Sequence, residues 1–389
     1  MCSFFLKNKQ LLPIVQGGMG VGISAHRLAG TVASYNAMGT ISSVDLRRHH
    51  DDLMNPSLMP QDKESKKAHI NKQNLIALHR EIQEAKKLSQ GKGAVAVNVM
   101  KAVTAYPDYV QQACESGADA IVVGAGLPLD LPELTKNYPE VALIPILSDA
   151  RGVRVILRRW ARSQRLPDAI VIENPNNAAG HLGVTAEKDV GKKIYAFSAV
   201  IQDIKKLFKS LSINIKQIPI IAAGGIHLPE QVKKLLALGA SAVQLGSAFA
   251  VTKECDAHEN FKQLIAQAKP EDIVTFNSVV GIPARAVRTP WLDAYLSKEN
   301  KLQSVAQERA CTEGWDCLSF CGLRDGAAKA GQFCINRQLV YALKGDTQRG
   351  LFFRGSEPLP FGSAIRTVHE LLNYLLSAMP ASLRLALNK

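Results

Sequence analysis

The chain of 389 residues lacks any apolar run of the roughly 18 residues that a membrane-spanning helix requires. Its first residues, Met1–Lys7, carry only a short apolar patch, without the longer apolar segment and cleavage pattern of a signal peptide. We therefore expect a cytoplasmic protein that does not associate with a membrane.

Two further absences narrow the class of function. The formal net charge is +13, but the Lys and Arg residues are spread among acids and form no basic arm, helix-turn-helix or zinc finger. We expect no specific nucleic-acid partner, and the positive charge instead favours small anionic ligands. The seven cysteines are an odd number and include no C-x₂-C pair, so we expect reduced thiols and no disulfide framework.

What is present is a regular alternation of short apolar runs with segments of helical period, up to about residue 255. Eight strands are predicted: Leu12–Gln16, Gly39–Ser42, Ala94–Asn98, Ala120–Gly124, Ala142–Ser148, Ala169–Glu173, Ile218–Ala223 and Ala242–Gly246. Seven helices are predicted between them: Ala25–Tyr35, Asn74–Leu88, Pro107–Ser116, Pro132–Tyr138, Val153–Ser163, Ala196–Leu211 and Pro229–Leu238. This pattern predicts an α/β fold, a closed (β/α)8 TIM barrel with its active-site groups on the loops after the strands.

An open, doubly wound α/β sheet is the competing fold. That fold carries a dinucleotide fingerprint in its first βα turn, and the run Gln16–Gly22 is rich in glycine but lacks the G-x-G-x-x-G spacing and a following acidic strand end. We therefore prefer the barrel.

The pattern changes after the barrel. We divide the chain into a barrel over 1–255, a smaller and mainly helical accessory region over 256–360 that covers the barrel mouth, and 361–389, where the helix Ile365–Met379 packs back on the barrel. Within the accessory region Ala327–Leu343 has helical period. The polar segment Arg47–Lys72 is predicted to be a long loop and a candidate lid.

Two successive strand ends carry glycine, in Ala223-Gly224-Gly225 and in Gly246-Ser247. Either pair alone reads as an ordinary tight turn. Glycine also lets backbone N–H groups approach an anion, and the last two strands of a barrel are its usual phosphate position. Together the two turns favour a phosphorylated cofactor or substrate.

A third glycine loop follows the first strand, at Gln16, Gly17, Gly18 and Met19. An amide that both donates and accepts, beside a soft thioether, suits a flat heteroaromatic ring, and a glycine-rich turn with a packing methionine explains the same residues equally well. Asn98 ends the third strand, where it either points into the barrel mouth or caps the next helix.

His181 is the sharpest catalytic candidate. It lies between Gly180 and Gly183 on the loop after the sixth strand, where an imidazole can exchange protons near neutral pH or bind an anion. A lone histidine is more often structural, but this one falls in the predicted ring of active-site loops. Asp149, after the fifth strand, is predicted to be a helix N-cap.

In their order along the chain these motifs resemble those of the nitronate monooxygenases, formerly called 2-nitropropane dioxygenases. The resemblance runs from Pro13 to Phe249 and rests on Gln16–Gly20, Asn98–Met100, Gly180–Gly183, Ala222–Ile226 and Leu245–Phe249. It implies FMN held without a covalent bond, with the phosphate on the two late glycine turns, the ring beside the first-strand loop, and His181 over the ring as catalytic base or anion-binding group. The FMN-binding residues expected on this basis are Gln16, Gly17, Gly18, Met19, Asn98, Gly180, Ala223, Gly224, Gly225, Gly246 and Ser247.

The reaction that the resemblance implies is oxidation of a small anionic alkyl nitronate with O2 to a carbonyl compound and nitrite, without a metal or nicotinamide. The same motifs mark flavin-dependent enoyl-acyl-carrier-protein reductases and some quinone reductases, so an NAD(P)H-dependent FMN reductase of quinones or enoyl thioesters is the second interpretation. A phosphate-binding barrel without redox activity is the third. One residue departs from the family pattern: Ala179 stands where a second glycine commonly precedes the histidine. The sequence neither requires nor excludes an oligomer.

Four cysteines lie close together in the accessory region, at Cys311, Cys317, Cys321 and Cys334. Thiolates are the ligands of zinc and of iron–sulfur clusters, but this spacing matches neither the paired zinc pattern nor the ferredoxin patterns. Reduced, partly buried thiols are the alternative that we prefer, so we expect no metal.

Overall fold

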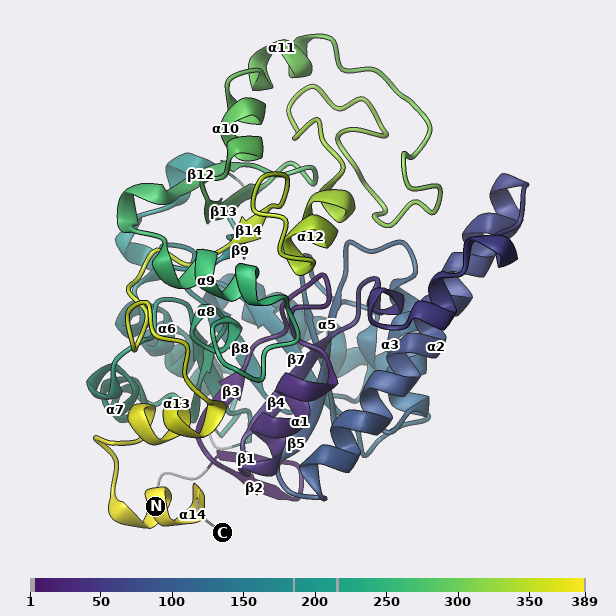
Figure 1. Ribbon diagram of the computed structural model, residues 1–389. Coiled ribbons are helices and arrows are strands. Elements are labelled where there is room, and N and C mark those ends of the chain that lie inside the picture. The colour runs from purple at the N-terminus through teal and green to yellow at the C-terminus, as the bar shows by residue number, and fades with distance from the viewer. Residues whose placement is uncertain (1–3, 185, 215–216, 388–389) are drawn as a thin grey trace.

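The computed structural model describes residues 4–184, 186–214 and 217–387. Eight parallel strands close into a barrel in the order β10-β11-β3-β4-β5-β6-β7-β8 (Figure 1). Their bounds are β3 (Ile14–Gln16), β4 (Met38–Ser42), β5 (Ala94–Met100), β6 (Ala120–Gly124), β7 (Ala142–Leu147), β8 (Ile170–Glu173), β10 (Ile220–Ala223) and β11 (Ala242–Leu245). Each predicted strand overlaps one of these, and the predicted TIM barrel is confirmed.

A hairpin of β1 (Phe4–Leu6) and β2 (Lys9–Leu11) lies at the end of the barrel opposite the accessory region (Figure 1). Phe4, Leu6 and Leu11 are buried and pack against the side chains that fill the barrel interior, many of which are alanine. The short apolar patch near the N-terminus therefore belongs to the core, where it closes the bottom of the barrel; Met1–Ser3 lie outside the described residues.

Helices surround the barrel and bury one face each. Their bounds are α1 (His26–Ser34), α2 (Lys63–Ser89), α3 (Tyr106–Glu115), α4 (Leu131–Leu134), α5 (Ala150–Trp160), α6 (Phe197–Ser210), α7 (Pro229–Leu238) and α8 (Ser247–Ala250). In α5, for example, Val153, Ile156, Leu157 and Trp160 are buried, at the spacing of one helical face. Within the described part of the chain, no helix combines the length and apolar character needed to cross a membrane.

The segment Arg47–Lys72 corrects one expectation. Its first part forms the short 3₁₀ turns η1 (Leu46–His49), η2 (Asp51–Met54) and η3 (Pro56–Leu58), but its last ten residues are the start of α2 and not a loop. The Asp62 side chain accepts a hydrogen bond from the Ser65 N–H and caps that helix. The polar composition of these first turns reflects solvent exposure, which a helix tolerates as well as a loop does.

The accessory region adds an unpredicted sheet to its helices. It contains α9 (Glu259–Gln267), β12 (Ile273–Asn277), β13 (Pro283–Val287), α10 (Pro290–Leu296), α11 (Glu299–Ser304), α12 (Ile335–Leu343) and β14 (Phe352–Phe353). The three strands pair antiparallel, and β9 (Gly180–His181), from the barrel loop, pairs with β13. This sheet and α12 lie over the barrel mouth (Figure 1).

The C-terminal segment returns to the barrel. The predicted helix Ile365–Met379 is found, somewhat shorter, as α13 (Val368–Leu375), which contacts α1, α7 and α8 and is followed by α14 (Ala381–Leu387). The helix predicted over Ala327–Leu343 begins only at Ile335, where α12 starts. The division into three parts itself stays a prediction.

Candidate functional site

Two adjoining cavities open at the carboxyl ends of the barrel strands, where the fold predicts an active site. The larger has a volume of about 250 Å³ and the smaller about 140 Å³. The residues that line both are Gly18, Met19, Glu173, Ala179, Gln244, Gly246 and Ser247. One elongated ligand can therefore occupy both cavities.

The smaller cavity is built on the two glycine turns. Ala223 ends β10, Gly224 and Gly225 follow it, and all three line this cavity, with φ of +99° at Gly224 and +76° at Gly225. A Cβ added at Gly224 would lie 2.9 Å from the backbone oxygen of Asn174, so both the backbone conformation and the packing require glycine there. The turn thus brings main-chain atoms, with no side chain between, to the cavity wall.

The second glycine turn, Gly246–Ser247 after β11, also lines the smaller cavity. Gly246 is the N-cap of α8, and Ser247 is its first residue, so the N–H groups at this end have no partner within the helix. The Ser247 hydroxyl accepts a hydrogen bond of 3.1 Å from the N–H of Gly355, which ties the segment 355–360 over this cavity. Main-chain N–H groups at a helix start beside a small cavity fit a phosphate group.

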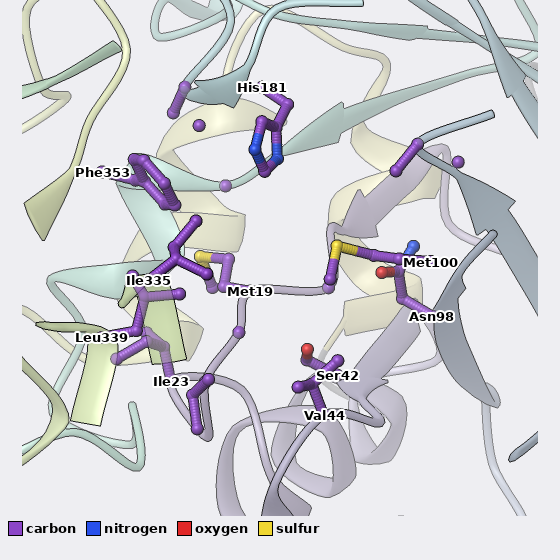
Figure 2. A pocket seen from close by; sticks show the side chains of 18 of the residues that line it. Met19, Ile23, Ser42, Val44, Asn98, Met100, His181, Ile335, Leu339 and Phe353 are labelled. Carbon is purple, nitrogen blue, oxygen red and sulfur yellow. The ribbon is translucent and has the colours of Figure 1, made fainter. Parts of the chain in front are cut away.

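The loop after β3 forms the wall between the cavities. Gly17 lines the smaller cavity, and Gly18 and Met19 line both. A Cβ at Gly18 would lie 2.4 Å from the Cβ of Asn98, so the two segments touch only because residue 18 is glycine. Asn98 itself lines the larger cavity, and because α3 begins only at Tyr106, Asn98 is not its N-cap (Figure 2).

Gln16 is the one expected site residue that the structure keeps apart from the others. Its side chain is buried, lines neither cavity, accepts a hydrogen bond of 2.8 Å from the Thr40 N–H and donates to the Thr40 carbonyl. The amide that both donates and accepts therefore joins β3 to β4.

His181 projects into the larger cavity (Figure 2). It is held by β9, where its backbone lies opposite Ala284 of β13, and by Gly180 and Gly183, both with positive φ. Its Nε2 is buried without a hydrogen-bond partner, and its ring centroid lies 6.0 Å from that of Phe353. Burial lowers the pKa of His181 to about 4, so the imidazole is neutral near pH 7.

Glu173 was missed by the sequence interpretation. It ends β8, its backbone is paired with Ala223, and its side chain lines both cavities. Burial alone raises its pKa to about 7. Its position as the last residue of a predicted strand was the available signal, because such residues face the barrel mouth.

The accessory region closes the larger cavity. Ile335 and Leu339 of α12 line it together with Phe353 (Figure 2). Cys317 also lines this cavity. Arg337, on the same helix, points elsewhere and forms an ion pair of 2.8 Å with Glu313. Side chains from this part of the chain therefore line the larger cavity opposite the barrel loops.

A buried polar cluster seats α12. The Asn336 amide donates a hydrogen bond of 3.0 Å to Asp45, which also accepts from Arg47 at 2.8 Å and Arg48 at 2.9 Å. Burial acts to raise the pKa of Asp45, but the two guanidinium groups outweigh it and hold the pKa below its usual value. The cluster joins the loop after β4 to the accessory region.

Cys311, Cys317, Cys321 and Cys334 are half-buried free thiols. Burial raises the pKa of Cys317, and the three other thiols lie near enough to raise it further. In the described ranges, no three histidine, cysteine or acidic side chains converge on the position of a single metal ion. The expectation of reduced thiols without a metal stays a prediction.

The fold and the site together define an α/β barrel with a pair of glycine turns next to a covered, largely apolar chamber, into which a histidine without a hydrogen-bond partner at Nε2 projects. The family model for nitronate monooxygenase matches residues 5–378, and the chain belongs to this family. It is therefore a flavin-dependent oxidoreductase of the nitronate monooxygenase type, and the interpretation as a barrel without redox activity is set aside.

Individual relatives agree with this assignment. A probable nitronate monooxygenase of Bacillus subtilis is 26% identical over 302 residues, which cover 75% of this chain and 81% of that protein. Among solved structures, FabK from Thermotoga maritima superposes with a TM-score of 0.63 at 22% identity, covering 96% of this chain and 94% of that one. A nitroalkane oxidase from Streptomyces ansochromogenes gives a TM-score of 0.61 at 17% identity, with 97% of each chain covered. At these identities the two structures support the fold alone.

Proposed function

We propose that the protein binds FMN and oxidises alkyl nitronates with O2 to carbonyl compounds and nitrite. The cavities fit this cofactor: the turns at Gly224–Gly225 and Gly246–Ser247 would hold its phosphate, and the loop at Gly18–Met19 would lie beside its ring. FMN, when bound, supplies the electron acceptor and the site of reaction with O2. The residues of the chain would bind the cofactor and the substrate, orient them toward each other and shield them from water.

His181 is the residue that we assign to the substrate. Its buried, unpartnered Nε2 is the single observation that carries the proposal, because a buried polar atom of this kind costs free energy unless a ligand satisfies it. A neutral imidazole either accepts a proton from the carbon next to a nitro group or donates its N–H to a nitronate oxygen. Both actions keep the substrate next to the flavin ring.

The test uses the purified holoenzyme. Anaerobic mixing with propionate 3-nitronate is expected to bleach the oxidised flavin absorbance rapidly, whereas NADH and NADPH leave it unchanged. His181→Ala is expected to retain FMN, because the cradle lies on other loops, and to lose a factor of about 10²–10⁴ in turnover. Bleaching by a nicotinamide but not by the nitronate would contradict the proposal.

A reductase of quinones or enoyl thioesters is the second candidate. The observation in its favour is the apolar wall formed by Ile23, Val44, Met100 and Leu339, which suits a substrate with a larger apolar body than a short nitronate (Figure 2). The same anaerobic experiment separates the two, because a reductase takes its electrons from the nicotinamide.

A further inference from the structure

The charge of the ligand chamber is opposite to that of the chain. The molecule carries a formal net charge of +13, yet neither Lys nor Arg is among the described residues that line the two cavities. The titratable carboxyl and imidazole groups there are Glu173, Glu357, His181 and His227. A phosphate dianion would therefore be held by backbone amides with two carboxyl groups in the same chamber.

The surroundings of three of these four groups differ from those of Glu173. His181, on β9, is neutral near pH 7 because burial lowers its pKa to about 4. The Glu357 carboxylate accepts a hydrogen bond from the Asn177 amide, and His227 Nδ1 lies 3.3 Å from the Gly225 carbonyl. The nearby guanidinium of Arg285, on β13, donates to the Ala178 carbonyl and does not line either cavity.

Glu173 has no such partner. Within the described ranges no hydrogen bond or ion pair satisfies its carboxyl group, which lies where the two cavities join, next to the strand that leads into Gly224. A ligand that spans both cavities must pass this group. A neutral carboxyl there donates its O–H to a ligand oxygen, whereas a carboxylate can only accept and repels an anion.

We propose that Glu173 takes up one proton when FMN binds, so that cofactor binding is linked to pH through this side chain. The inference rests on the proposed function for the identity of the ligand. In the binding step a proton from solvent adds to a Glu173 oxygen, and no other bond forms or breaks. Because burial already raises the pKa of Glu173 to about 7 in the free protein, little free energy is needed to protonate it near neutral pH.

The sign of the linkage follows directly. A phosphate dianion raises the pKa of a nearby carboxyl still further, so the complex holds more protons than the free protein above pH 7. Affinity is then greatest below the pKa of the free protein and falls as pH rises above it, by at most about tenfold per pH unit for one proton. The phosphate's own second pKa is about 6, so measurements between pH 7 and 9 keep its charge constant.

The experiment measures FMN binding to apo-protein by quenching of flavin fluorescence across this pH range. The affinity of the wild type for FMN is expected to fall as pH rises, by up to about tenfold per pH unit. The affinity of Glu173→Gln is expected not to change with pH. Calorimetry at pH 8 in two buffers of different ionisation enthalpy is expected to show uptake of close to one proton by the wild type and none by the variant. This proton count on the wild type needs no variant to fold.

Two control variants identify the group responsible. Glu299→Gln removes another carboxyl whose pKa burial raises, on α11 and outside both cavities, and His227→Asn removes the imidazole of the smaller cavity. Both are expected to keep the wild-type slope. A flat wild-type profile, or a slope lost in His227→Asn and kept in Glu173→Gln, would overturn the inference while leaving the flavoprotein assignment in place. A wild type that binds no FMN at any pH would instead refute the proposed function.

Discussion

The substitution Gly246→Val tests whether the turn at β11 holds the phosphate. Gly246 has φ of −109°, which other residues adopt, and an added Cβ would have the Met19 Sδ at 3.8 Å as its nearest neighbour, an ordinary contact. The folded chain should therefore tolerate the side chain at a cost of about 0.5 kcal/mol or less. The added methyl groups, however, extend into the space that both cavities share.

The expected loss is in cofactor affinity. A hydrogen bond to a charged group contributes about 1.5–3 kcal/mol, so displacing the phosphate from one amide weakens FMN binding roughly 10- to 150-fold. The assay is flavin content after purification, with titration of apo-protein by FMN and a thermal melt of the apo-protein. We expect a nearly unchanged melting temperature together with a low flavin content.

Two further glycines provide matched controls. Gly117 has φ of +81° and no atom within 4 Å of an added Cβ, so Gly117→Ala should lose about 1–2 kcal/mol of stability from backbone strain and keep its flavin. Gly224→Ala introduces backbone strain and a backbone clash at a turn proposed to hold the phosphate, so this variant should lose both stability and flavin. A Gly246→Val protein with wild-type flavin content would refute the placement of the phosphate.

Three other outcomes follow from the site and its supports. Because His181 loses its proton with a pKa of about 4, turnover should stay constant from pH 5 to 8 and fall only below that, and an inflection near 6.5 in the rate profile would contradict this. The carboxylate of buried Glu81 lies 2.7 Å from the His26 ring and 2.9 Å from the His50 ring, and although burial acts to raise its pKa, these partners lower it to about 2. Glu81→Gln should therefore lower the free energy of unfolding in urea by about 3 kcal/mol at pH 6. The difference in stability between variant and wild type should vanish as pH falls from 4.5 to 2. Asn336→Ala should cost about 1–3 kcal/mol and speed proteolysis of the segment before α12, whereas Arg337→Ala, which removes only a more exposed ion pair, should do neither.

The barrel was predictable because of how its strands are buried. Parallel strands covered on both faces form continuous apolar runs in the sequence, and β6 and β7 are of this kind. The antiparallel sheet was not predictable in the same way, because β13 begins with Pro283 and two of its partners, β9 and β14, lie far along the chain. A proline at the first position of a strand is tolerated there, but in the sequence it reads as an interruption.

The site residues likewise divide into those that the sequence predicts and those whose role depends on partners distant in the chain. The glycine turns and His181 could be found because each has a local requirement, for positive φ or for a position after a strand. Gln16 has the right chemistry for a ring, but its partner is Thr40 on the neighbouring strand, and that pairing exists only once the barrel has formed. Glu173 is the converse case, because the sequence shows only a strand end and closure of the barrel places its side chain in the wall of both cavities.

The pairing of β3 with β11 joins the first barrel strand to the last, and the Gly17 N–H donates to the Leu245 carbonyl across that seam at 2.9 Å. The cavity walls at Gly18–Met19 and Gly246–Ser247 come from opposite sides of it. On the proposed placement of the flavin, a ribosome-bound chain that has not yet emerged beyond β11 would lack a complete cofactor site, and the flavin would join only a finished barrel. On that placement the bound flavin would contact both sides of the seam and so stabilise the closed barrel.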